Sequence, residues 1–268
     1  MNYEYMNDIE KLKSEKHPFD VWDNVLKYAT NQTKEIPPDD LERMKWFGIF
    51  YRKRESLENY MLRIRITGCE FTSIQAREIS RIAYEYGYGF VDITTRSNIQ
   101  VQGLDITKVP KIIERINRAG LSTKQTGLDN VRNVNCHPYS GIDPSELIDT
   151  RDLCRSITDL FIDNREYANL PRNFNFSVSG MQFHEPHYWT QDLSFLAYRK
   201  KDGEIVFQVL IGGMQGLRPR VAWHLPIVIK TDQVVFFTKT ILNLFRIEGL
   251  RDRRDQIRFR YLIEKKGI

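Results

Sequence analysis

The nine residues from Asn59 to Thr67 (NYMLRIRIT) constrain the fold most strongly, because apolar and polar side chains alternate along them. This period of two is typical of a strand with one buried face. Thr72 and Gln75 then have the spacing of a helix capping box, which predicts a helix reaching about Tyr86. A strand followed closely by a helix favours a layered α+β domain.

The next segments extend this order. GFVDITT and NIQVQGL read as two strands, and DITKVPKIIERINRAGL reads as a helix closed by Gly120. The order strand, helix, strand, strand, helix is typical of a ferredoxin-like arrangement, with helices on one face of a mainly antiparallel sheet.

The flanking segments predict a lead-in and a second α+β unit. Residues 1–58 are expected to form a polar, partly helical lead-in, with HPFDVWDNVLKYA and the segment after the prolines of EIPPDDLERMKWFG as its helices. We expect a ferredoxin-like half-domain over 59–125 and an α+β half-domain over 126–268. The latter would contain a loop at Thr126–Asp149, a helix at about 150–163, strands near 174–180, 192–199 and 205–212, and helices at about 232–248 and 252–265.

The net charge of the chain favours one class of partner but does not identify a particular one. The net charge of +5 and the pI near 9.0 favour anionic partners. No run approaches the roughly 18 apolar residues of a membrane helix, and the first residues are too charged for a signal peptide. We therefore expect a soluble protein of the cytoplasm or plastid stroma that does not bind a membrane.

The cysteines argue against a disulfide framework and against a metal site. Cys69, Cys136 and Cys154 are odd in number and widely spaced, whereas an iron–sulfur cubane normally takes four thiolates, some of them closely spaced. His184 and His187 (HEPH) resemble a metal pair, but the proline between them denies them a helix, so a surface loop is favoured.

Arginines supply the candidate site. Arg63 and Arg65 fall on the face of the first strand opposite its apolar side chains. A solvated sheet face is the simplest explanation for either one alone. Arg96 ends another predicted strand, Arg132 lies in a polar loop, and Arg172 opens the stretch LPRNFN. Several planar guanidinium groups converging on one place would suit a ligand with many carboxylates.

The loop around Arg132 is the strongest single candidate. Asn130 and Asn133 flank it, and their amides can fix a guanidinium by hydrogen bonds. Nucleic acid is the competing partner, because arginines interleaved with aromatic residues also suit phosphates and bases. The dispersal of the basic residues and the lack of a recognised motif argue against it.

Eight segments in order carry a resemblance to a known family: KWFGIFYR, YMLRIRITG, VDITTRSNIQVQGL, GLDNVRN, GIDPSELIDTRDL, ANLPRNFNFSVSG, VLIGG and IRFRYLIEKKGI. They resemble the siroheme-dependent nitrite and sulfite reductases, and most closely the first half of the ferredoxin-dependent nitrite reductases. The resemblance implies a ferredoxin-like half-domain followed by a siroheme-binding α+β half-domain, one copy of a pseudo-twofold repeat. It also implies that the second copy holds the four cysteines of the 4Fe-4S cluster, so this chain would not ligate that cluster.

The resemblance also implies roles for single residues. Arg63 and Arg132 match arginines that contact nitrite or sulfite and the porphyrin carboxylates, and Arg96 and Arg172 match siroheme carboxylate ligands. Arg65 shares the face of Arg63 and is assigned to the cofactor with it. The segments that line the cofactor in the family contribute Gln100, Gln125, Thr126 and Asn130.

The chain departs from the family where a distal lysine is expected. That position is Asn173, and an amide donates hydrogen bonds but delivers neither a proton nor a full charge. Asn175 is the residue expected of the nitrite-type enzymes. Ser97 replaces a usual glutamine, and the segment Met214–Pro219 lacks the small-residue pattern of the nitrite reductases.

Two functions remain open at this stage. In the first, the chain supplies siroheme and oxyanion binding to a reductase, beside a cluster-bearing second half or as a homodimer, with ferredoxin as donor. In the second, it is a non-catalytic relative that binds a tetrapyrrole or an anion, which Asn173 and the missing thiolates favour.

Overall fold

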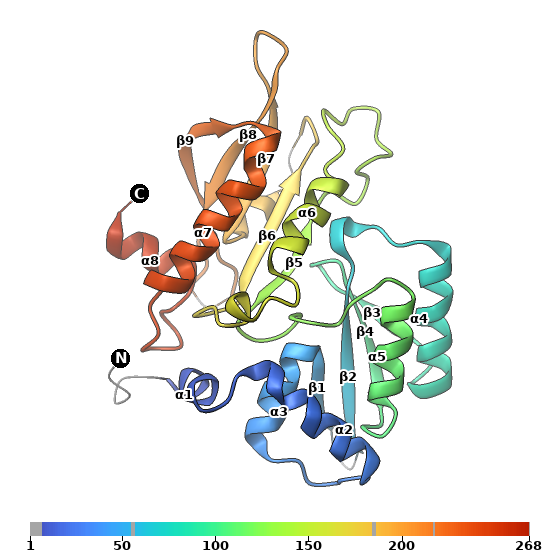
Figure 1. Cartoon of the computed structure of the whole chain (residues 1–268). Coiled ribbons are helices and arrows are strands. Elements are labelled where there is room, and N and C mark those ends of the chain that lie inside the picture. The colour runs from blue at the N-terminus through green and yellow to red at the C-terminus, as the bar shows by residue number, and fades with distance from the viewer. Residues whose placement is uncertain (1–6, 55–56, 184–185, 217, 268) are drawn as a thin grey trace. The chain divides into compact units, whose positions relative to one another are not determined.

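The structure, a computed structural model, describes residues 7–54, 57–183, 186–216 and 218–267. These residues divide into two units (Figure 1). The first, called here the ferredoxin-like unit, comprises Lys11–Ile66 and Phe71–Leu128. The second, called the mixed-sheet unit, comprises the other described residues, chiefly those from Asp129 onward.

The sheet of the ferredoxin-like unit is antiparallel and has four strands in the order β1-β2-β4-β3. The three predicted strands are confirmed as β2 (Leu57–Arg65), β3 (Val91–Ile93) and β4 (Asn98–Leu104). β1 (Ile49–Arg54) was not predicted and lies within the expected lead-in. It pairs with β2 and takes the edge position, so β2 lies inside the sheet with Leu62 and Ile64 fully buried.

The two predicted helices of this unit are confirmed, although the second begins at Val109, four residues into the predicted segment. α4 (Ser73–Tyr86) has the complete capping box of Thr72 and Gln75, and α5 (Val109–Arg118) is followed by Gly120 with φ of 75°. α4 packs on β4 and lies beside α5. The remaining α-helices of the N-terminal part are α1 (Asp8–Glu15), α2 (Trp22–Thr30) and α3 (Pro38–Met44).

The mixed-sheet unit has five strands in the order β5-β6-β7-β8-β9, namely β5 (Val131–Asn135), β6 (Phe174–Ser179), β7 (Leu193–Arg199), β8 (Ile205–Ile211) and β9 (Trp223–Ile229). β5, β6 and β7 are parallel, and β8 and β9 continue antiparallel. β6, β7 and β8 confirm the predicted strands. β5 corrects the expected long loop at 126–149, and β9 was not predicted.

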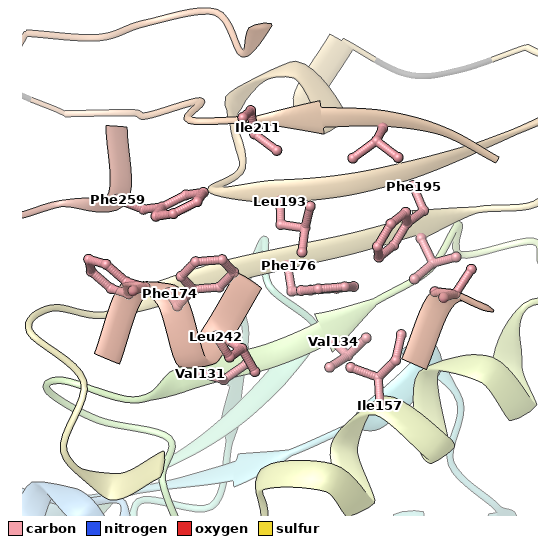
Figure 2. Close-up of a cluster of buried hydrophobic side chains, with 14 of the residues drawn as sticks. Val131, Val134, Ile157, Phe174, Phe176, Leu193, Phe195, Ile211, Leu242 and Phe259 are labelled. Atoms are coloured by element: carbon pink, nitrogen blue, oxygen red, sulfur yellow. The ribbon is translucent and has the colours of Figure 1, made fainter. Parts of the chain in front are cut away.

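Helices α6 (Arg151–Phe161), α7 (Val234–Glu248) and α8 (Phe259–Lys266) complete this unit (Figure 1). α8 begins seven residues later than predicted. α6 and α7 pack against the sheet through a core rich in phenylalanine, which includes Phe174, Phe176 and Phe195 (Figure 2). Short 3-10 turns lie at Pro18–Val21, Lys45–Phe47, Thr67–Cys69, Arg165–Ala168, Pro186–Thr190 and Thr231–Gln233.

The fold class is therefore α+β, as predicted, with one antiparallel and one mixed sheet. Within the described residues, none of the helices is both long and apolar enough to cross a membrane. The division of the chain into a lead-in and two half-domains at 58 and 125 stays a prediction.

Candidate functional site

Arg63 in the ferredoxin-like unit is held in place from three directions. Its Nη1 donates to the carbonyl of Thr126 at 3.0 Å, and its guanidinium lies 4.5 Å from the ring centre of Phe50. Gln100 is its register partner on β4 and, with the amide oxygen toward Arg63, accepts from Nε and Nη2 at 3.3 and 3.1 Å. The guanidinium is thus fixed before any ligand binds.

Positive charge gathers around Arg63. Burial, followed by repulsion from Arg52 and Arg96, lowers the pKa of Arg63 to about 10. The group remains protonated at neutral pH, so the same repulsion favours any anion that binds nearby. Arg96 lies in the turn that joins β3 to β4, next to Ser97, whose φ of 51° is left-handed.

Arg65 occupies a deeper position than a solvated sheet face would give it. It is 3% exposed, and its Nη2 donates to the carbonyls of Lys124 and Gln125, each at 3.2 Å. Burial alone lowers its pKa to about 9. Arg65 therefore anchors the segment that carries two other predicted cofactor residues, Gln125 and Thr126. Both of these are fully buried, and Thr126 donates its hydroxyl to the carbonyls of Thr123 and Arg63.

In the mixed-sheet unit, the other predicted residues lie on, or directly before, the neighbouring parallel strands β5 and β6. Asn130 directly precedes β5, and its carbonyl accepts from the backbone N–H of Phe174 at 2.9 Å. Arg132 lies on β5 and is partly exposed. Arg172 and Asn173 precede β6 and are also partly exposed. Strand pairing therefore brings the segments at 130–132 and 172–175 side by side.

A buried carboxylate, Asp129, supports Arg172. Asp129 is fully buried and accepts two hydrogen bonds of 2.8 Å from Arg254, one to each oxygen. Arg172 Nη1 lies 3.7 Å from the same carboxylate. Burial, followed by repulsion from Arg254, lowers the pKa of Arg172, and Arg258 adds to this repulsion. Asp129 therefore neutralises only part of a three-arginine cluster.

A second buried carboxylate supports Asn175. Asp192 is fully buried and accepts the backbone N–H of Asn175 at 2.8 Å. It also accepts from Nη2 and Nε of Arg258, at 2.6 and 3.3 Å. Asp192 thus fixes the backbone at Asn175 and holds Arg258 beside it.

These supporting residues were missed by the sequence analysis. The signal for the arginines was the run RDRRDQIRFR at 251–260, which was assigned to a helix. A single aspartate in a loop or at a strand end carries no such signal. Asp129 and Asp192 are recognisable only when the fold brings Arg254 and Arg258 to them across 125 and 66 residues of sequence.

The polar face of β6 is open only near its start. Asn173 is partly exposed, whereas Asn175, Ser177 and Ser179 are 2%, 0% and 0% exposed. The turn at Pro186–Thr190 packs against β6, and its Tyr188 is fully buried. Only the start of β6 is therefore accessible to a ligand.

Metal ligands are not gathered in the described part of the chain. Among those residues, no three His, Cys, Asp or Glu side chains are arranged to hold a metal ion. His184 lies outside the described residues, and His187 lies in the 3-10 turn at Pro186–Thr190.

Taken unit by unit, these observations define an α+β protein that carries arginines on β2 and β5 and in the segments just before β4 and β6. The comparisons with known proteins agree with this. Residues 127–268 match the family described as the nitrite and sulphite reductase 4Fe-4S domain, and residues 51–119 match the nitrite/sulfite reductase ferredoxin-like half domain. The chain belongs to the nitrite and sulfite reductase family.

Among curated proteins, the chain is 37% identical over 271 residues to the ferredoxin–nitrite reductase of Leptolyngbya laminosa, covering 98% of this chain and 52% of that protein. It is 32% identical to the chloroplastic ferredoxin–nitrite reductase of Arabidopsis thaliana, covering 98% of this chain and 47% of that protein. The chain therefore spans about half the length of the curated relatives it matches.

A solved structure, the NirA protein of Mycobacterium tuberculosis, superposes with a TM-score of 0.92 at 25% identity, covering 98% of this chain and 51% of that one. Dissimilatory sulfite reductase I superposes with a TM-score of 0.68 at 11% identity and supports the fold alone. These comparisons confirm the predicted family and the ferredoxin-like half-domain.

Proposed function

We propose that the chain binds siroheme and a small oxyanion, nitrite or sulfite, and supplies this half of a ferredoxin-dependent reduction site. The observation that carries the proposal is the setting of Arg63. This cation is largely buried and already oriented by Gln100, Thr126 and Phe50, and the other charges that shift its pKa are also arginines. Such a group gains stability when an anion binds.

The residues present fit siroheme by charge. Siroheme carries eight carboxylates, and a guanidinium binds a carboxylate bidentately. Arg63, Arg96, Arg132 and Arg172 are each proposed to bind such a carboxylate. When bound, siroheme supplies an iron centre for the anion. Arg65 is then a positioning residue, because it holds the backbone of 124–125.

The chain's own contribution to the reaction is electrostatic. Arg63 and Arg132 would bind the oxyanion and stabilise negative charge that develops during its reduction. Asn173, which is partly exposed, would orient the anion by hydrogen bonds without delivering protons, whereas Asn175 is buried and would support the start of β6. Proton delivery would then come from solvent or from another residue.

The 4Fe-4S cluster is proposed to be ligated elsewhere, by a cluster-bearing second half. This chain has three cysteines, whereas a cubane cluster normally takes four thiolates. Electrons would then reach the anion from ferredoxin through that second half. A homodimer could repeat the arginine surface but could not provide the ligands.

The test is a titration of the purified full chain with siroheme, followed by its absorbance. We expect saturable binding by the wild-type chain. Arg63→Gln should weaken binding by about 10- to 100-fold, because a hydrogen bond to a charged group contributes about 1.5–3 kcal/mol. Arg118→Gln is the matched control, since Arg118 is an exposed arginine on α5 of the same unit.

Circular dichroism of each variant separates loss of binding from loss of folding. The proposal is overturned if the folded wild-type chain does not bind siroheme, or if Arg63→Gln and Arg118→Gln bind equally well. Weak binding by both variants would show a general dependence on charge and would contradict the role given to Arg63.

One observation favours a second candidate, a non-catalytic relative that binds a tetrapyrrole or anion. Asn173 stands in the place of the distal lysine and remains partly exposed beside Arg172. Assay of the siroheme-loaded chain, combined with a cluster-bearing half from a relative, with reduced viologen and nitrite or sulfite separates the two candidates. Turnover supports the reductase, and binding without turnover supports the relative.

A further inference from the structure

Three cysteines that are far apart in the sequence converge in the mixed-sheet unit. Cys69 Sγ donates to the carbonyl of Cys136 at 3.1 Å, and Cys136 Sγ donates to the carbonyl of Gly68 at 2.9 Å. The Cys154 thiol, on α6, lies near enough to Cys136 to affect its pKa. All three are present as thiols. The cluster joins the turn at Thr67–Cys69, the end of β5 and helix α6.

The backbone at Cys69 is bent to bring its side chain to this cluster. Gly68 and Cys69 have φ values of 65° and 57°, in the left-handed region that a residue with a side chain rarely adopts. A Cβ placed on Gly68 would lie 3.6 Å from the Cβ of Cys154, so the turn packs directly on the first part of α6. Strain of this kind in a thiol-bearing turn is a reason to look for a function.

The three thiols differ in access to solvent. Cys69 is partly exposed, whereas Cys136 and Cys154 are 2% and 0% exposed. The nearby Cys154 thiol, together with burial, raises the pKa of the Cys136 thiol, so Cys136 stays protonated. The turn that carries Cys69 packs on the N-terminal part of α6, which leaves Cys69 at the more accessible side of the cluster. Reaction with a dissolved oxidant is therefore expected to begin at Cys69.

The arrangement of the three cysteines favours a disulfide over a metal site. In the described part of the chain, the cysteines do not form a group of ligands placed to hold a metal ion. The reciprocal hydrogen bonds set Cys69 and Cys136 between the same two backbone segments. Cys154 instead lies on α6 and is fully buried.

We propose that Cys69 and Cys136 form a peroxide-oxidisable thiol pair, with Cys154 remaining a thiol. The Cys69 thiolate attacks a hydroperoxide and breaks its O–O bond, giving a sulfenic acid and releasing an alcohol or water. The Cys136 thiol then attacks the sulfenic sulfur and releases water, so that a disulfide forms. Two thiols are oxidised by two electrons, and one hydroperoxide is reduced. Neither siroheme nor nitrite takes part, so this proposal does not depend on the proposed function.

The test treats the reduced full chain with hydrogen peroxide and counts thiols after denaturation. The count should fall from three to one, and a dithiol reductant should restore it. Peptide mapping without reduction should find Cys69 joined to Cys136, with Cys154 alkylated. Cys154→Ser should lose both of its thiols to the same disulfide, whereas Cys69→Ser should keep both of its own.

Several results would overturn the proposal. These are three thiols surviving peroxide, a Cys136–Cys154 linkage as the main product, or a disulfide between two chains on a non-reducing gel. Cys69 is the residue to substitute first, because it is partly exposed and Cys69→Ser is expected to fold. The unfolded wild-type chain is the control for specificity, since it should give mixed pairings.

Discussion

At the scale of single residues, local sequence patterns did not predict the side chains that hold the candidate arginines in place. Alternation predicted that Arg63 and Arg65 share one face of a strand, but not that Arg65 is buried against two carbonyls. Those carbonyls come from a loop near 124–125, which folds back onto β2. A local pattern contains no information about such a return. Asp129 and Asp192 were missed for the same reason, because their arginine partners are far away in the sequence.

The first prediction concerns Asn173, and it rests on the proposed function. Asn173→Lys should raise the affinity of the siroheme-loaded chain for nitrite several-fold, because a cation replaces an amide beside the anion. The site at the start of β6 is partly exposed, so the unfolding free energy should change by less than about 0.5 kcal/mol. Calorimetric titration with nitrite measures the first quantity, and urea unfolding the second.

Asn173→Gln is the matched control, because it lengthens the side chain without adding charge. Equal affinity of the Lys and Gln variants for nitrite would contradict an electrostatic role at position 173.

The second prediction concerns Asp192. Asp192→Asn should lower the unfolding free energy by about 3 kcal/mol, because it removes one partner of a buried ion pair and leaves Arg258 without its carboxylate. Urea unfolding measures this change. Asp252→Asn, at an exposed position in the same unit, should leave the midpoint unchanged. A loss below about 0.5 kcal/mol at Asp192 would show that water replaces the carboxylate.

At the scale of helices and strands, local signals worked wherever one element carries its own pattern. The capping box of Thr72 and Gln75 predicted α4, and the alternation of apolar and polar residues at 59–67 predicted β2. β5 was missed because VRNVN is short and half polar, and its strand character comes from pairing with β6. β9 was missed because it contains Pro226, which is tolerated here on an edge strand.

The third prediction concerns how α2 and α3 are held together. Asp40 on α3 is buried and accepts from Tyr28 Oη at 2.6 Å and from Asn24 Nδ2 at 2.7 Å, both on α2. Burial acts to raise the pKa of Asp40, but these hydrogen bonds outweigh it and the pKa lies below its usual value. The stabilisation is therefore present above the unfolded pKa of about 3.9 and is lost as the pH falls through the lower folded value.

Asp40→Asn should accordingly destabilise the chain at pH 7 and have a much smaller effect near pH 3. Urea unfolding at the two pH values measures this difference. Asp39→Asn changes the exposed neighbour on the same helix and should behave like the wild type at both. An equal loss at pH 7 and pH 3 for Asp40→Asn would show that the charge of Asp40 is not involved.

At the scale of the whole molecule, family membership was predictable because the eight matching segments extend over most of the chain. The mixed sheet was not, because parallel neighbours such as β5 and β6 are joined by a long crossover whose end point no local pattern specifies.

The fourth prediction concerns the chain on its own. Purified and reconstituted with iron and sulfide, it should retain no acid-labile sulfide and should not reduce nitrite with viologen, even when loaded with siroheme, since three cysteines do not complete a cubane site. Stoichiometric labile sulfide, or steady turnover by this chain alone, would contradict it. A cluster-bearing half from a relative, reconstituted in parallel, is the positive control.

The pairing of Asp129 with Arg254 limits when this part of the chain can fold during its synthesis. At about 5–20 residues per second, a ribosome adds the 125 residues between them in about 6 to 25 seconds. During that interval Asp129 has no guanidinium from Arg254, and removing its carboxylate from water is unfavourable. The start of β5 is therefore expected to stay hydrated until the segment at 251–260 has left the exit tunnel. The Asp129–Arg254 ion pair therefore forms late, after β5 and β6 have both been synthesised.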